Sequence, residues 1–206
     1  TDTMTHIQSF SSKRRGFTLV ELLVVIAIIA VLAALGFAGF NMAIQKAKKT
    51  SAQTCMSQLI IACDDYFEAY QQLPLGSKSN ADEEQKSDNK LMAALLGMES
   101  AEDENYKLQS YFTFKASNGK GQGAYDGLER TQNRAELLGP WQNKQKDDRY
   151  YRLMFNYDYD KELREPQALG NEIMYDKNVL IYHMGKDGKV GGKNDQDNVY
   201  SWQKSK

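Results

Sequence analysis

The sequence predicts an α+β fold in which a long N-terminal helix packs on a small antiparallel β-sheet, with a metal-type loop near the C-terminus. Three observations predict it. An apolar run covers residues 17–40, helical periodicity continues to about residue 73, and the remaining chain is polar with short aromatic-rich segments. A helix followed by several strands is the element order typical of an α+β domain.

Composition limits the classes of protein that fit this chain. Its 206 residues are enough for one domain of ordinary size and a long helix. The formal net charge is −1, so the charge balance gives no indication of a nucleic acid partner. Residues 17–40 are almost entirely apolar, whereas residues 77–206 are polar and rich in tyrosine. We therefore expect the two parts to face different solvents.

The apolar run at residues 17–40 is long enough to cross a bilayer. As a helix it rises about 36 Å, against a hydrocarbon core of about 30 Å. A secretory signal has a shorter apolar stretch and ends in a small-x-small cleavage site, and no two alanines of this run lie two positions apart. The cations Lys13, Arg14 and Arg15 place the N-terminus in the cytoplasm. We therefore expect a retained single membrane span, with the chain beyond about residue 42 on the far side.

One carboxylate, Glu21, lies inside this apolar run. A charged side chain is costly in hydrocarbon, and such residues usually have a partner or a function. Alternatively, Glu21 lies near the headgroups and its side chain extends to them. Position alone leaves both interpretations open.

Helical periodicity continues beyond the apolar run. Apolar residues step by three or four positions along one face: Ala52, Met56, Leu59, Cys63, Tyr66, Tyr70 and Leu73. The opposite face carries Lys46, Lys48, Lys49, Gln53, Asp64 and Glu68. Pro74 and Gly76 favour an end to the helix. The pattern predicts one helix over residues 18–73, apolar all round in its first half and amphipathic in its second.

The two cysteines, Cys55 and Cys63, both fall in this predicted helix. Eight residues of helix separate them by about 12 Å, which is too far for a disulfide. We interpret both as small buried apolar residues, with intermolecular pairing as the alternative.

The polar remainder of the chain predicts short elements. They are an exposed loop at 77–90, a helix at 91–98, a strand at 105–115, a flexible loop at 116–127, a strand at 149–160, and one interrupted strand or two strands at 171–185. Helix first and strands later favours an antiparallel sheet that packs on the helix.

The segment "KRRGFTLVELLVVIAIIAVLAAL" (13–35) resembles the N-terminus of type IV pilins and type II secretion pseudopilins. In that family a basic leader ends in glycine and phenylalanine follows. The resemblance implies that a prepilin peptidase cuts after Gly16 and methylates the new amine of Phe17. It also implies that Glu21 pairs with the N-terminal amine of a neighbouring subunit during assembly.

The resemblance divides the chain into four parts. Residues 1–16 are a cytoplasmic leader peptide, and residues 17–40 are a transmembrane and filament-core helix. Residues 41–76 continue that helix in amphipathic form, and residues 77–206 are a globular pilin-like α+β domain. The segment "LGPWQNKQKDDRYYRLMFNYDYD" (138–160) resembles the proline–tryptophan segment and following strand of the major pseudopilin.

The segment "HMGKDGKVGGKNDQDNVYSW" (183–202) combines acidic residues with glycines. Oxygen ligands on a glycine-rich loop suit a hard cation such as Ca²⁺, although the spacing excludes an EF-hand. The alternative is a solvated polar turn. The segment also resembles the calcium-binding C-terminal loop of major pseudopilins. That resemblance implies side-chain ligands from Asp187, Asp195 and Asp197. Asn198 stands where an acid is common, and the Met184 carbonyl is the expected backbone ligand.

No arrangement of residues predicts an enzyme. His6 lies in the leader and His183 beside a strand end, which leaves no two-histidine metal site. Asp158 and Asp160 would share one face of the predicted 149–160 strand, where a charged strand edge is a simpler interpretation than a catalytic pair. We expect no catalytic activity.

The sequence therefore predicts a structural subunit of a type II secretion pseudopilus, closest to the major subunit. It would polymerise through its N-terminal helix at the bacterial inner membrane, with the globular domain in the periplasm, and drive protein export. The expected partners are other pilin-like subunits, prepilin peptidase and an assembly platform, and the expected cofactor is calcium. The alternatives are a major or minor type IV pilus subunit, or a single-pass anchored periplasmic binding protein that never polymerises.

Overall fold

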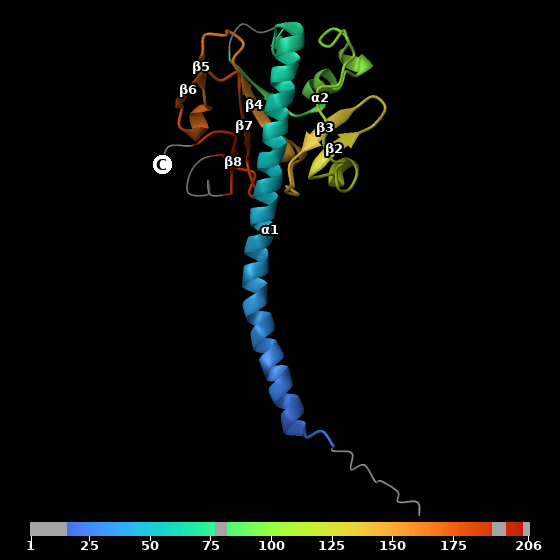
Figure 1. Ribbon diagram of the computed structural model, residues 1–206, viewed down its shortest axis with the longest axis vertical. Coiled ribbons are helices and arrows are strands. Elements are labelled where there is room, and N and C mark those ends of the chain that lie inside the picture. The colour runs from blue at the N-terminus through green and yellow to red at the C-terminus, as the bar shows by residue number, and fades with distance from the viewer. Residues whose placement is uncertain (1–15, 77–81, 191–196, 204–206) are drawn as a thin grey trace, which may run out of the picture. The chain divides into compact units, whose positions relative to one another are not determined.

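The computed structural model describes residues 16–76, 82–190 and 197–203, apart from the side chains of residues 35–38. The chain divides into two compact units, Thr1–Ile44 and Gln45–Lys206. The helix α1 (Leu19–Tyr70) contributes to both (Figure 1).

Helix α1 confirms the predicted long helix, although it ends earlier than residue 73. Gln71, the first residue after it, has a φ of 55°, a left-handed conformation that stops helical hydrogen bonding. The last turn of α1 contains no basic residue. A positive charge comes instead from Lys107, outside the helix, whose Nζ donates to the Ala69 carbonyl oxygen at 2.8 Å.

In the first unit, α1 presents apolar side chains on all its described faces. Leu19 is 87% exposed, and the large apolar residues from Val20 to Leu32 are exposed as well. The most apolar 18-residue window of α1 has a mean hydropathy of 2.9 and no buried residue. Among the described residues, α1 is the one helix long and apolar enough to span a membrane. With this composition, the unit suits a membrane anchor.

In the second unit, one face of α1 forms the centre of the core. The buried residues of this face are Ala52, Cys55, Met56, Leu59, Ala62, Cys63 and Tyr66. They confirm the predicted apolar stripe. Both cysteines are buried and free, as predicted, and burial raises the pKa of the Cys55 thiol to about 12. The thiols therefore act as apolar packing groups.

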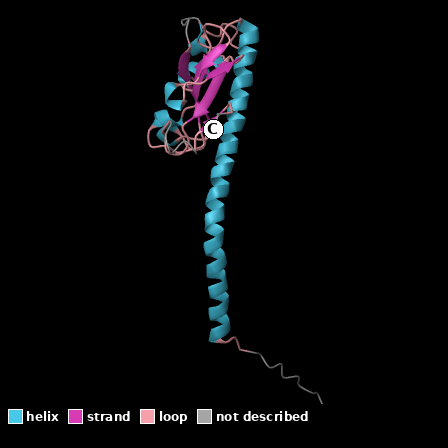
Figure 2. Cartoon of the chain, turned by 90° about the vertical axis from the view of Figure 1, so that its left-hand side faces the viewer, coloured by secondary structure: helices cyan, strands magenta, loops and turns pink. Residues whose placement is uncertain are grey.

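The main sheet has four strands in the order β1 (Glu83–Lys86), β4 (Arg152–Phe155), β7 (Val179–His183) and β8 (Val199–Tyr200). All neighbouring strands are antiparallel, with Leu153 opposite Ile181 at the centre. The inward side chains of β4 and β7 join the α1 stripe in one core. Figure 2 shows this sheet beside the C-terminal part of α1. The predicted α+β arrangement is confirmed.

The described part of this unit also contains two further hairpins and a short helix. The hairpins are β2 (Gly127–Arg130) with β3 (Ala135–Leu138), and β5 (Glu162–Arg164) with β6 (Ile173–Tyr175). The short helix α2 (Asn89–Leu96) confirms the helix predicted at 91–98. Asp88 caps its N-terminus and Gly97, in the left-handed region, ends it. Among the described residues, 3₁₀ turns lie at Glu99–Ala101, Gly121–Gly123, Lys146–Arg149 and Gln167–Leu169.

Several predicted boundaries differ from the structure. The exposed loop predicted at 77–90 is wrong where residues 83–86 form strand β1 and residue 89 begins α2. The side chains of β1 are polar because it is an edge strand, so no apolar alternation marked it. Residues 77–81 lie outside the described residues.

The strand predicted at 105–115 is also wrong, because no residue there belongs to a strand. Its backbone makes isolated bonds, such as Tyr111 N–H to the Leu95 carbonyl at 2.8 Å. Phe112 is buried while its neighbours are more exposed, so the apolar alternation reflects burial of single side chains along an irregular segment.

The strand predicted at 149–160 is confirmed only over residues 152–155, whereas the 171–185 segment forms two strands as one alternative expected. Asp158 and Asp160 therefore lie in a turn and not on a strand face. There the Asp160 N–H donates to Asp158 Oδ1 at 3.4 Å, and the Glu162 N–H donates to Asp160 Oδ1 at 2.8 Å. Both carboxylates stabilise local turns.

Candidate functional site

The first candidate site is the start of α1, where Thr18 and Glu21 cap the helix. The Thr18 N–H and Oγ1–H both donate to Glu21 Oε2 at 2.9 Å, and the Glu21 N–H donates to Thr18 Oγ1 at 3.2 Å. This reciprocal pair is a capping box, which satisfies backbone donors that have no partner in the first turn.

The capping box gives Glu21 a role that the sequence interpretation missed. The Thr-x-x-Glu spacing at residues 18–21 is its signal and is visible in the sequence. Both bonds to the carboxylate engage Oε2. Among the described residues no hydrogen bond engages Oε1, which therefore remains able to accept a bond from a further donor.

Gly16 and Phe17 lie in non-helical backbone immediately before the cap. Phe17 is 75% exposed, and a methyl group placed on Gly16 would meet no atom within 4 Å. Both residues are therefore exposed within the described part of the chain. Residues 1–15 of the predicted leader lie outside the described residues.

The second candidate site is the loop between β7 and β8, where Asp197 folds back onto residues 185–187. Asp197 Oδ2 accepts hydrogen bonds from the Lys186 N–H at 2.6 Å and the Asp187 N–H at 3.0 Å. Gly185 has a φ of 64°, and a Cβ there would lie 2.5 Å from the Asp197 carbonyl oxygen. Only glycine fits this close approach.

Two of the predicted metal ligands are in contact in the structure, through the Asp187 backbone and the Asp197 carboxylate. Asp187 and Asp197 meet at this turn, and Asp187 Oδ1 accepts a bond from the Lys189 N–H at 2.9 Å. Met184 and Asn198 are both buried at the ends of the loop, and Asn198 Nδ2 donates to the Tyr200 hydroxyl at 3.2 Å. Asp195 lies outside the described residues.

The donor chemistry of this loop fits a hard cation in kind, because carboxylates and carbonyls supply oxygen atoms. The described residues do not form a group of three or more His, Cys, Asp or Glu side chains that could hold a metal ion. Within the described part of the chain, Asp187 and Asp197 are therefore an incomplete set of side-chain ligands.

A buried histidine anchors the loop. His183 Nδ1 accepts a bond from the Gly185 N–H at 3.0 Å, and Nε2 lies 3.1 Å from the Arg149 carbonyl oxygen. Burial lowers the pKa of His183 to about 4, although the bond to Arg149 opposes this change. The ring is therefore neutral at pH 7, and its two contacts assign the proton to Nε2.

A second anchor is Asn143, which ties the loop to the segment after β3. Its Nδ2 donates to the Gly185 carbonyl at 3.1 Å and to the Asp148 carbonyl at 3.2 Å. Arg149 Nε donates to the Asn143 carbonyl at 2.7 Å. Sequence reasoning missed both anchors, because for each of them the partner on another segment is distant in sequence.

The comparisons with known proteins bear on the first site. Residues 11–37 match the prokaryotic N-terminal methylation motif, a span that includes Gly16, Phe17 and Glu21. The match supports a type IV pilin-like or pseudopilin subunit, a structural class whose members polymerise and are processed by prepilin peptidase. No curated protein and no solved structure matches the chain.

We expect the Asn143→Ala substitution to loosen the β7–β8 loop, because it removes the donor to the buried Gly185 carbonyl and to the half-buried Asp148 carbonyl. The expected loss in the free energy of unfolding is about 1–3 kcal/mol. Amide hydrogen exchange should quicken at residues 185–189, relative to its rate in α2. Gln142→Ala, which truncates an exposed neighbour, is the control. Unchanged exchange in the Asn143 variant would contradict the anchoring role.

Proposed function

We propose that this chain is a structural subunit of a type II secretion pseudopilus, closest to its major subunit, which polymerises through α1 to drive protein export. The observation that carries the proposal is the methylation motif at residues 11–37, which runs directly into an exposed apolar helix. Proteins with this motif form filaments, and an apolar helix that its own chain leaves exposed needs neighbours or lipid around it.

Processing is the first step of the proposed function. Prepilin peptidase cuts the bond between Gly16 and Phe17, removes residues 1–16 and methylates the new amine of Phe17. The exposed, non-helical backbone at these two residues supports this assignment. The cations at 13–15 hold the leader in the cytoplasm, where the cut takes place.

Assembly is the second step, and Glu21 is its proposed centre. Its Oε2 caps the helix of its own chain. Its Oε1 accepts a hydrogen bond from the N-terminal ammonium group of a neighbouring subunit. A carboxylate and an ammonium group are each costly in hydrocarbon, and pairing lowers the cost of both. The pair also fixes the axial stagger between neighbouring helices, since each Glu21 meets one amine.

The exposed side chains of α1 account for the two environments of such a subunit. Before assembly, lipid covers the apolar residues from Val20 to Leu32. After assembly, the same side chains pack against α1 of neighbouring copies in the fibre core. The second unit stays in the periplasm and forms the fibre surface, and an assembly platform in the inner membrane inserts new subunits.

Calcium is the proposed cofactor of the β7–β8 loop. Asp187, Asp195 and Asp197 would supply carboxylate oxygens, with the Met184 carbonyl and Asn198 completing the set. The meeting of Asp187 and Asp197 supports this proposal. When bound, calcium would neutralise these carboxylates and hold β8 to β7, which stabilises the C-terminal edge of the sheet.

Two substitutions separate the capping role of Glu21 from its charge. Glu21→Gln keeps a side chain that can complete the capping box but removes the negative charge. Glu21→Ala removes both. We expect both variants to insert into the membrane at wild-type levels and to lose fibre formation at least about tenfold, as counted by electron microscopy of sheared fibres.

Thr18→Ala is the matched control, because it weakens the cap by about 1 kcal/mol and leaves the charge of Glu21 in place. We expect this variant to form fibres. Wild-type fibres from Glu21→Gln would mean that Glu21 acts through the cap alone. If the wild-type chain forms no fibres and keeps its leader, the result would favour a periplasmic protein that is anchored in the membrane and does not polymerise.

Removal of calcium is expected to destabilise the second unit. The full chain in an uncharged detergent should melt several degrees higher in 1 mM CaCl₂ than in excess EGTA, since a ligand that binds the folded state raises its stability. Asp187→Asn and Asp197→Asn should each abolish most of the difference between the two conditions. Asp103→Asn, at an exposed position outside the loop, should keep it. Equal melting temperatures in calcium and in EGTA would contradict the proposal that calcium is a cofactor.

A further inference from the structure

We propose that a groove at the beginning of the second unit binds the phosphate of an anionic phospholipid headgroup. The groove has a volume of about 550 Å³ and is here named the Lys48 groove. Its cationic side chains are Lys48, Lys144 and Lys186, and Trp141 and Asn143 lie in its wall.

Hydrogen bonds hold the walls of the Lys48 groove in place. Trp141 Nε1 donates to Gln45 Oε1 at 3.1 Å, which joins α1 to the segment after β3. Asn143 joins that segment to the Gly185 carbonyl of the β7–β8 loop at 3.1 Å. Three separate parts of the chain therefore form one hollow, and a ligand need not order them.

The charges of the groove favour an anion. Among the described residues, no ion pair links Lys48, Lys144 or Lys186 to a carboxylate. Gln142 and Gln145 add amide groups to the lining, and amide N–H groups donate to phosphate oxygens. Three lysines without carboxylate partners and neutral amide donors are the groups that phosphate recognition requires.

Two acidic residues, Asp148 and Asp187, also line the groove. Both make contacts on the side of the β7–β8 loop. Asp187 Oδ1 accepts a bond from the Lys189 N–H at 2.9 Å. Asp148 Oδ2 lies 2.7 Å from the position that a Cβ on Gly188 would occupy. The loop backbone therefore engages the Asp187 carboxylate, and the Asp148 carboxylate lies against Gly188; the lining still contains three lysines against two carboxylates.

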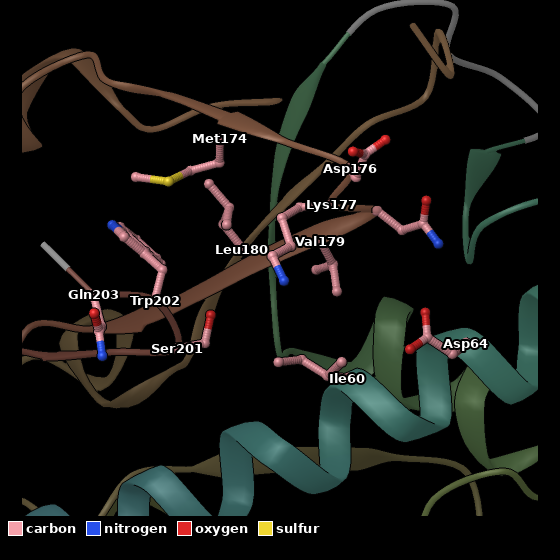
Figure 3. A pocket seen from close by; sticks show the side chains of 11 residues that line it. Ile60, Asp64, Met174, Asp176, Lys177, Val179, Leu180, Ser201, Trp202 and Gln203 are labelled. Atoms are coloured by element: carbon pink, nitrogen blue, oxygen red, sulfur yellow. The ribbon is translucent and has the colours of Figure 1, made fainter. Parts of the chain in front are cut away.

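A second hollow of the same unit provides a comparison. It has a volume of about 540 Å³ and is lined by Asp64, Asp176 and a single lysine, Lys177, together with apolar side chains (Figure 3). Its charges disfavour an anion. The excess of lysines over carboxylates in the Lys48 groove is therefore not shared by this hollow of similar volume.

The position of the groove in the chain identifies the source of the phosphate. Gln45 is the first residue of the second unit, and Lys48 closely follows the apolar stretch of α1 in sequence. Residues directly after a membrane span lie within reach of the headgroups, and lysines near an anionic surface gain binding energy there. An anionic headgroup is accordingly the ligand that this chain meets at high local concentration. This inference depends on membrane anchoring and not on polymerisation.

The test uses the full chain in an uncharged detergent, with binding counted by native mass spectrometry. The probes are dihexanoyl phosphatidylglycerol, the zwitterionic dihexanoyl phosphatidylcholine, and inorganic phosphate. The groove variant is Lys48→Gln/Lys144→Gln/Lys186→Gln. Its matched control is Lys90→Gln/Lys120→Gln/Lys161→Gln, which removes three exposed lysines outside the groove and changes the net charge equally.

We expect phosphatidylglycerol to bind the wild-type chain more tightly than phosphatidylcholine does. The groove variant should bind it at least about tenfold more weakly, whereas the control should bind within about twofold of wild type. If the groove variant does not fold, Lys144→Glu against Lys90→Glu makes the same comparison at two exposed positions.

Equal losses in the groove variant and the control would overturn the site, because they would mean a general charge effect. No loss in the groove variant would overturn it as well. If inorganic phosphate binds as tightly as phosphatidylglycerol, the result would contradict the claim that the phosphate belongs to a lipid headgroup. A chain that binds phosphatidylglycerol through the groove but forms no fibres would leave this inference standing and would remove only the proposed polymerisation.

Discussion

Burial of one face of α1 against the sheet is the contact on which the second unit depends. The face combines small residues such as Ala52 and Ala62 with large ones such as Met56, Leu59 and Tyr66, all almost completely buried. Strands β4 and β7 supply the opposite surface through Leu153 and Ile181. Since β7 ends at His183, this packing also fixes where the β7–β8 loop begins. The candidate metal loop and the Lys48 groove therefore take their positions from the core.

The same helix faces two environments. Beyond Gln45 it has a buried face and a polar face, whereas the described residues before that point expose apolar side chains on all sides. A surface of this kind is stable only in lipid or against other apolar helices. The capping box of Thr18 and Glu21 completes the helix at its apolar end, where backbone donors without partners would be costly. Membrane insertion and assembly are thus two ways to satisfy one physical requirement.

Most of the helical structure could be predicted from the sequence, because its signals are local. Periodicity identified α1 and its buried stripe, and Gly97 marked the end of α2. The apolar run of β7 likewise indicated a strand, and all five of its residues are buried. Strand β3 was not predicted, because a glutamate such as Glu136 is typical of a surface position. In the structure Glu136 is buried, and Lys146, Arg134 and Tyr150 donate hydrogen bonds to its carboxylate. Such pairings depend on tertiary structure and leave no periodic pattern.

The candidate sites likewise combine features with a local sequence signal and features formed by residues distant in sequence. The glycines and acids of the β7–β8 loop indicated a candidate metal site, and the structure shows the Asp187 N–H donating to the Asp197 carboxylate. The anchors His183 and Asn143 could not be predicted, because the partner that ties each of them to another segment lies 34 or 42 residues away in sequence. The Lys48 groove draws on three segments, so no contiguous motif encodes it.

The central claim is that α1 begins, in the mature chain, at a processed N-terminus. The most direct measurement is the intact mass and N-terminal sequence of the protein purified from membranes of cells with an active prepilin peptidase. The account predicts a chain that lacks residues 1–16 and begins with N-methylated Phe17. A chain that retains the leader, with the bond between Gly16 and Phe17 intact, would contradict it.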